Sequence, residues 1–265
     1  MLLRRVIDHV RTQNWTAVAL DFVIVVAGVM LALWASQLVA DRNARRGAEI
    51  SQRAMNADLM TMAIGAMRRF TTHPCLVEAM ARLNEAASVE DGASFTPPAP
   101  GRLRKVEDSI FEDYYPVGLW NYPSTAFDRA VATGAFDHMD AGRAADYAEA
   151  YEWVRQLATA NAEEEVLRSR LSLVEMVEEM DAPTRLAIRE IVAELDGWNQ
   201  GVLNSGRFLF DTMHRLGITP TDEDRAKWLE YNELARNVRG DCVIDLPLDL
   251  TGGAVGNGWS KKVTK

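Results

Sequence analysis

The feature that most constrains this chain is its apolar segment 16–40, TAVALDFVIVVAGVMLALWASQLVA. Its first twenty residues contain a single ionisable side chain, Asp21. A helix rises about 1.5 Å per residue, so this length crosses the roughly 30 Å hydrocarbon core of a bilayer. Trp15 and Trp34 stand near the ends of the segment, where indole rings favour the headgroup level. We therefore predict a transmembrane helix over 16–40.

Two other interpretations of this segment are a buried core helix and a cleaved signal peptide. Arginines on both flanks, among them Arg5, Arg11, Arg42 and Arg46, are unusual for a core helix. The leader before the segment is long for a signal peptide, and no small-x-small cleavage site follows it. The sequence therefore favours an anchor that is retained.

Three small residues within the segment, Gly28, Ala32 and Ser36, are spaced four apart and share one helix face. Small side chains allow a second transmembrane helix to approach closely, so these three are a candidate helix–helix contact. Charges inside spans are often functional, but Asp21 lies within two turns of Trp15. The presence of Asp21 is explained equally well if its carboxylate reaches water at the membrane interface.

The leader, residues 1–15, has apolar side chains at near-helical spacing with arginines opposite, which predicts a basic amphipathic helix at the membrane surface. The leader and span together resemble the opening of a family of uncharacterised single-span bacterial membrane proteins. The matching residues of its NWTAVALDFVIVV-type block are Asn14, Trp15, Ala17, Asp21, Ile24, Val25, Val26 and Gly28. A later stretch, PSTAFDRAVATGAFDHMD, is similar more loosely. The resemblance implies a membrane anchor and a helical extramembrane domain, and it implies no activity.

The rest of the chain predicts an all-α fold, in which the transmembrane helix continues into a stalk helix and a bundle of long antiparallel helices. Pro74 is expected to interrupt the stalk. We expect the first long bundle helix to run to Asp181, the second to run from Thr184 towards Arg215, and a shorter one to end at Val238. The predicted regions after the span are a stalk (41–88), a loop region rich in proline and aromatic residues (89–123), the helical bundle (124–239) and an extended or flexible tail (240–265).

Gly197 and Gly201 lie within the second long helix and suggest a close helix crossing or a kink. Tyr114, Tyr115, Trp120 and Tyr122 in the loop region are a candidate binding surface, because tyrosine and tryptophan give large contact areas. The alternative, which we favour, is an aromatic cap packed on the core.

Charge and cysteines restrict the partners and the compartment. Residues 47–265 hold 23 basic and 35 acidic side chains, a formal charge of −12, which disfavours nucleic-acid binding. Cys75 and Cys242 can form a disulfide in an oxidising compartment or remain buried free thiols. Basic residues flank the span on both sides, so the flanking charges do not decide the topology. The short basic leader and the even cysteine number favour a bacterial inner-membrane protein with a periplasmic domain.

No catalytic, cofactor or metal motif stands out in the sequence. His73 and Cys75 are too few ligands for a metal, and the run Glu163–Glu165 is expected to be a solvated helix face. We predict a non-enzymatic protein without cofactors, whose partners are the bilayer and a protein or a second copy of the chain. The alternatives are a membrane-tethered enzyme with an atypical carboxylate site and a ligand-sensing bundle that acts through a partner.

Overall fold

The computed structural model describes residues 15–88, 93–94, 101–106, 109–113, 115, 120–171, 174 and 179–248. The fold is all-α, as predicted, with two short antiparallel strand pairs added to it. The helices are α2 (Trp15–Ala86), α3 (Thr125–Ala132), α4 (Ala141–Arg170), α5 (Ala182–Leu216) and α6 (Asp222–Arg239), with 3-10 turns η1 (Ala135–His138) and η3 (Gly240–Cys242). The strands are β1 (Ala93–Ser94), β2 (Gly101–Val106), β3 (Ser109–Asp113) and β4 (Glu179–Met180).

The chain divides into two compact units, Met1–Ile50 and Ser51–Lys265. The described part of the first unit belongs entirely to α2, and nearly all of its apolar side chains between Leu20, at 60%, and Val39, at 57%, are exposed. This helix is long and apolar enough to cross a membrane. Residues 1–14, which include most of the predicted amphipathic leader, lie outside the described part.

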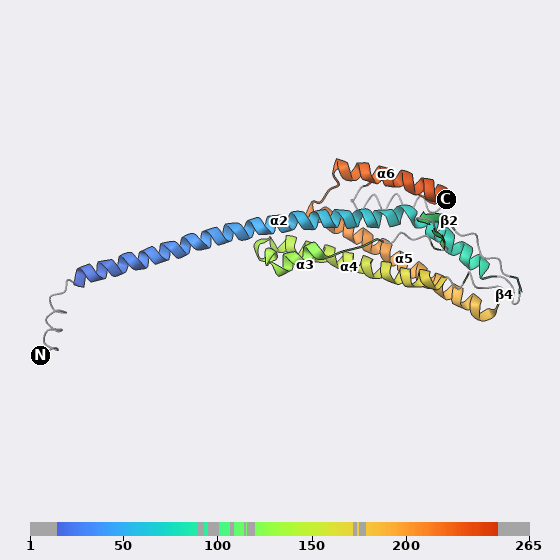
Figure 1. Cartoon of the computed structure of the whole chain (residues 1–265), viewed down its shortest axis with the longest axis horizontal. Helices are drawn as coiled ribbons and strands as arrows, with labels where there is room; N and C mark the ends of the chain where they lie inside the picture. Colours follow the sequence, from blue (N-terminus) through green and yellow to red (C-terminus); the bar gives the residue numbers. More distant parts are fainter. Residues whose placement is uncertain are drawn as a thin grey trace. The chain divides into compact units, whose positions relative to one another are not determined.

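The second unit has a core shared by the later part of α2 with α4 and α5. Leu76 and Leu83 from α2, Leu167 from α4, and Ile188 and Leu195 from α5 belong to one buried cluster. The two long helices α4 and α5 are antiparallel, since Arg143 near the start of α4 donates to the carbonyl of Leu216 at the end of α5. Figure 1 shows α6 on the other side of α2 from α4.

The predicted stalk is therefore a core element of the bundle over much of its length. Met55, Leu59, Met67 and Leu76 in this part of α2 are fully buried, because their spacing places them on one stripe against α4 and α5. Helix α2 also continues through Pro74, which was expected to interrupt it. A proline removes one backbone hydrogen bond and bends a helix, but the packing on both sides of Pro74 keeps the helix intact.

Capping residues begin α4, α5 and α6, and a glycine ends α5. The carboxylates of Asp140 and Asp181 accept from the backbone N–H groups three residues on, and so cap α4 and α5. Gly217 ends α5 in the left-handed conformation with φ of 72°. Thr221 and Asp224 form a capping box that begins α6.

Two regions differ from the prediction. Helix α4 ends at Arg170, not near Asp181, and Glu179–Met180 pairs instead with Ala93–Ser94 as β4 and β1. The predicted loop region also contains the hairpin β2–β3. Its proline and glycine content suggested a loop, whereas strand pairing depends on partners that local composition does not reveal.

The segment after η3 is an extended arm that packs on the bundle. Val243, Leu246 and Leu248 are buried, and the indole N–H of Trp228 donates to the carbonyl of Leu246 at 2.8 Å. The expected extended tail is thus anchored at least as far as Leu248. Residues 249–265 lie outside the described part.

Candidate functional site

A buried ion pair joins α2 to α4 in the centre of the bundle. Arg69 donates through Nη1 to Oε2 of Glu164 at 2.5 Å and through Nη2 to Oε1 at 2.6 Å. The side chains are 4% and 0% exposed, respectively. Burial lowers the pKa of Arg69, but the hydrogen bond and charge of Glu164 outweigh it, so the pKa is raised overall. Arg69 therefore stays charged inside the protein.

Asn199 of α5 connects this pair to His73. Its Oδ1 accepts from Nη2 of Arg69 at 3.2 Å, which leaves its Nδ2 facing Nδ1 of His73 at 2.8 Å. Because an amide nitrogen only donates, Nδ1 of His73 must accept, and the ring is neutral with its proton on Nε2. Burial lowers the pKa of His73, and the nearby charge of Arg69 acts in the same direction. The orientation of one asparagine thus sets the protonation of the histidine.

Two tyrosines from the aromatic segment close this buried cluster. The hydroxyl of Tyr115 donates to Oε1 of Glu164 at 3.1 Å, so the carboxylate has a further partner besides Arg69. Burial raises the pKa of both Tyr115 and Tyr122, and Glu164 adds to the rise for both. The two phenols are therefore neutral donors throughout the physiological range.

Arg68, the neighbour of Arg69, lies between two aromatic rings. Its guanidinium carbon is 4.3 Å from the ring centroid of Trp120 and 4.1 Å from that of Tyr231 on α6. Trp120 can lie this close to α2 because residue 65 is glycine: a Cβ there would meet the indole Cδ1 and Nε1 at 2.4 Å. Burial lowers the pKa of Arg68. We refer to Gly65, Arg68, Trp120 and Tyr231 as the arginine clamp.

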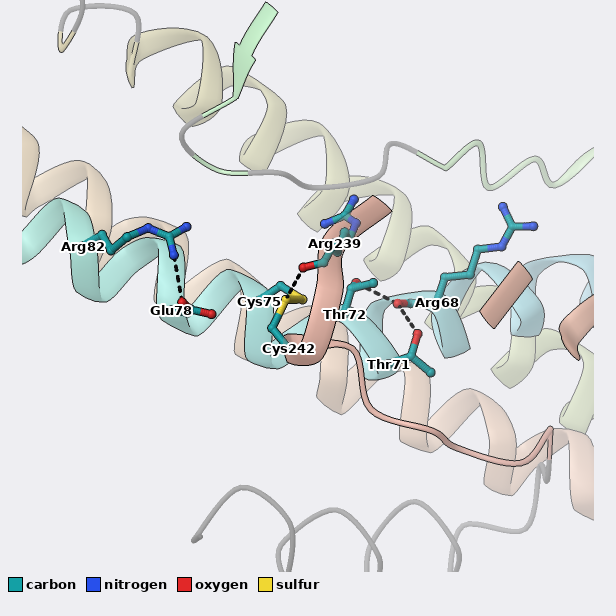
Figure 2. The surroundings of a disulfide bond; sticks show 8 residues. All are labelled: Arg68, Thr71, Thr72, Cys75, Glu78, Arg82, Arg239 and Cys242. Atoms are coloured by element: carbon teal, nitrogen blue, oxygen red, sulfur yellow. Dashed lines mark hydrogen bonds and ion pairs between the residues drawn. A yellow bond between two sulfur atoms is a disulfide. The ribbon is translucent and has the colours of Figure 1, made fainter. Parts of the chain in front are cut away.

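A disulfide between Cys75 and Cys242 ties η3, which directly follows α6, to α2, about two helical turns beyond Arg68 (Figure 2). Of the two alternatives that the sequence left open, the structure has the bonded one. Nearby, the hydroxyls of Thr71 and Thr72 donate to the backbone carbonyl of Arg68, at 3.0 and 2.8 Å. Figure 2 also shows the side chain of Arg68 extending away from the disulfide.

The other predicted site residues fall in different places. Gly28, Ala32 and Ser36 lie on an exposed face of α2, and an ideal Cβ at Gly28 meets nothing within 4 Å. Tyr114 lies outside the described residues. Tyr115 and Tyr122 are 0% and 8% exposed, so they pack on the core, as the favoured alternative expected, and do not form the candidate binding surface. Trp120 is partly buried in the arginine clamp.

Two further expectations need correction. Glu164 is fully buried, whereas the run Glu163–Glu165 was expected to be solvated. Gly197 and Gly201 have open space where a side chain would be, so neither marks a close crossing. The close approach is at Gly206, where a Cβ would lie 2.8 Å from the Phe70 ring.

The burial of Glu164 and Arg69 was not expected from the sequence, but helical periodicity would have predicted it. Glu164 follows Leu157 and Ala160 and precedes Leu167 at three- and four-residue steps, so it lies on the buried stripe of α4. Arg69 lies on the buried stripe of α2 in the same way, between Met62 and Leu76. A charge within an apolar stripe predicts a buried partner of opposite charge on a neighbouring helix.

The buried cluster is suited to holding helices together. Its charged groups are bonded to one another and enclosed, so neither is presented to a substrate. Within the described residues there is no group of three or more His, Cys, Asp or Glu side chains placed to hold a metal ion. The arginine clamp differs, because it places a half-buried cation near the surface.

Comparison of the chain with protein-family models, with curated proteins and with solved structures finds no match.

Proposed function

We propose that this chain is a single-pass protein of the bacterial inner membrane, whose helical bundle lies in the periplasm and serves as an interaction module for a partner protein or a second copy. The observation that carries the proposal is helix α2. One uninterrupted helix contains an exposed apolar stretch long enough for a bilayer and, further along, the buried core stripe of the bundle. Because the apolar stretch and the core stripe belong to the same helix, the observation supports a role at the membrane.

The disulfide supports the periplasmic side. Bonds such as Cys75–Cys242 persist in oxidising compartments, and the bacterial cytosol keeps most thiols reduced. The resemblance of the first 45 residues to single-span bacterial membrane proteins points to the same kind of anchor.

The use of the charged groups supports an interaction role over a catalytic one. Arg69 and Glu164 hold the helices together inside the bundle. Apolar side chains such as Phe208, Leu229 and Leu234 remain exposed on α5 and α6. They offer contact area to another protein.

Alkaline carbonate extraction of bacterial membranes tests the anchor. We expect the wild-type chain to remain in the membrane pellet and the variant Val25→Arg/Leu31→Arg to be released, because each arginine costs about 3 kcal/mol at the centre of a span. Leu186→Arg/Leu229→Arg is the matched control, since these leucines are as exposed as Val25 and Leu31 but lie in the second unit. Release of the wild-type chain would exclude a transmembrane anchor.

Thiol labelling of denatured protein, taken from cells whose thiols were first blocked, tests the compartment. A periplasmic bundle predicts that Cys75 and Cys242 become labelled only after reduction. Labelling without reductant would contradict the periplasmic assignment.

Photo-crosslinking in intact cells tests the interaction. A crosslinking amino acid at Phe208 or Leu229 should give a discrete product larger than the chain. Monomer alone from both positions, and from a set spread over α4, α5 and α6, would refute the interaction role.

A further inference from the structure

The arginine clamp holds a cation that has no counter-charge among the residues that the structure describes. The rings of Trp120 and Tyr231 cover the two faces of the Arg68 guanidinium, at 4.3 and 4.1 Å. No ion pair among the described residues joins Arg68 to a carboxylate. Arg68 therefore differs from Arg69, which is next to it on α2 and has Glu164 as its partner.

Two N–H groups in the clamp also lack an acceptor. Nε of Arg68 and Nε1 of Trp120 are buried, and neither has a hydrogen-bond partner in the part of the chain that the structure describes. Buried N–H groups nearly always have one. Both atoms are buried, so an external acceptor reaches the clamp only through the Nη groups of the half-buried Arg68.

The clamp is assembled by the fold from three separate parts of the chain. Gly65 makes room for the indole on α2, and α6 supplies Tyr231. The disulfide from Cys75 to Cys242 fixes the end of α6 against the same helix. Stacking on both faces restricts the guanidinium to one plane, which reduces the entropy lost when it binds an anion.

The geometry favours a carboxylate over larger anions. With both faces covered, only the edge of the guanidinium remains for hydrogen bonding. A planar carboxylate matches such an edge with two parallel N–H···O bonds, as Glu164 does with Arg69. Polyanions are disfavoured, because residues 47–265 carry a formal charge of −12.

We propose that the arginine clamp is a recognition site for a single carboxylate of a partner protein, bound edge-on by the Nη groups of Arg68. That the carboxylate belongs to a protein rests on the proposed function. Its source is either an acidic side chain or a chain terminus, which share the same chemistry.

Short peptides added to the full-length protein in neutral detergent micelles test the site. The acidic-side-chain probe is acetyl-Gly-Glu-Gly-amide, and the chain-terminus probe is acetyl-Gly-Gly-Ala with a free carboxylate. The control peptide is acetyl-Gly-Gln-Gly-amide, which has no charge. The readout is the NMR signals of the Trp120 indole N–H and the Arg68 Nε–H.

We expect at least one carboxylate peptide to shift both signals with saturation in the millimolar range, while the uncharged peptide leaves them in place. The peptide that binds more tightly identifies the source of the carboxylate. Arg68→Lys keeps the charge but removes the planar fork, and should weaken binding about tenfold or more. Tyr231→Leu removes one ring face and should weaken it several-fold. Arg53→Lys, an exposed arginine on the same helix, should bind as the wild type does.

Equal shifts with the uncharged peptide would overturn the proposal, as would unchanged binding by Arg68→Lys that retains the wild-type circular dichroism. Tighter binding of inorganic phosphate than of either carboxylate peptide would also overturn it. If crosslinking in cells finds a partner that Arg68→Lys captures equally well, the carboxylate site fails and the interaction role stands. If the clamp binds carboxylates but no crosslinked product forms in cells, the interaction role fails instead.

Discussion

Arg69 on α2 and Glu164 on α4, 95 residues apart in the chain, form a buried ion pair through two parallel hydrogen bonds. Asn199 of α5 bonds to the same guanidinium, so one arginine connects three helices. Desolvating two charges costs free energy that their attraction offsets only in good geometry. Such a pair adds little net stability but strongly disfavours any packing in which one partner is buried alone.

Glu164→Gln should therefore be strongly destabilising, because it leaves the Arg69 cation buried without a counter-charge. We expect the free energy of unfolding to fall by about 3–5 kcal/mol in urea titrations of the full chain in micelles. The double variant Arg69→Met/Glu164→Leu should lose clearly less than Glu164→Gln alone. Arg155→Ala, which breaks the exposed Arg155–Glu152 pair, is the control and should change little. Equal losses for single and double variants would contradict this account.

His73 should make the stability of the bundle depend on pH. Its pKa in the folded protein is lowered by burial, whereas the unfolded chain has a value of about 6.5. Between the folded pKa and about pH 6.5 the unfolded state therefore binds more protons than the folded state. The contribution of His73 to the free energy of unfolding is complete above about pH 6.5, and it falls as the pH decreases towards the folded pKa. His73→Gln should flatten the profile between pH 5.5 and 7.5, while His138→Gln at an exposed position should not. A profile unchanged by His73→Gln would show that other groups cause the dependence.

Alanine substitutions at four helical glycines should separate into two classes. Gly65→Ala and Gly206→Ala place a Cβ at 2.4 Å from Trp120 and 2.8 Å from Phe70, and should lower the melting temperature. Gly197→Ala and Gly201→Ala meet nothing within 4 Å and should raise stability by about 0.5–1 kcal/mol each, through helix propensity. Destabilisation by Gly197→Ala or Gly201→Ala would indicate a helix contact there after all.

Removal of the disulfide should lower stability without abolishing the fold. The bond joins residues 167 apart, and the chain-entropy argument gives an upper value of about 5 kcal/mol for a loop of this length. Cys75→Ser/Cys242→Ser should thus unfold at lower urea concentration than the oxidised wild type. Reduced wild-type protein should match the double variant, and a reductant should leave the double variant unchanged. A wild-type midpoint that reductant does not move would show that the disulfide is dispensable for stability.

The sequence by itself determined the features that depend on neighbouring residues. Hydropathy over 16–40 was enough to identify a helix suited to a membrane, because length and apolarity are local properties. The helix ends expected near Arg215 and Val238 lie one residue from the observed ends at Leu216 and Arg239, because helix-end signals act within one turn. The alternation of apolar residues at three- and four-residue steps established the helical class of the whole fold.

The tertiary structure decided what depends on residues far apart in the chain. It placed the predicted stalk in the core, because burial of Met55 and Leu76 requires partners on α4 and α5. It paired Glu164 with Arg69 and placed Arg68 in cation–π contact with Trp120 and Tyr231. The two arginines are nevertheless the same residue type at adjacent positions in the sequence. Their different surroundings follow from the helical turn of about 100° per residue, which points one arginine into the bundle and the other towards α6. Local sequence pattern specifies the helix, and the packing of distant helices gives each charge its partner.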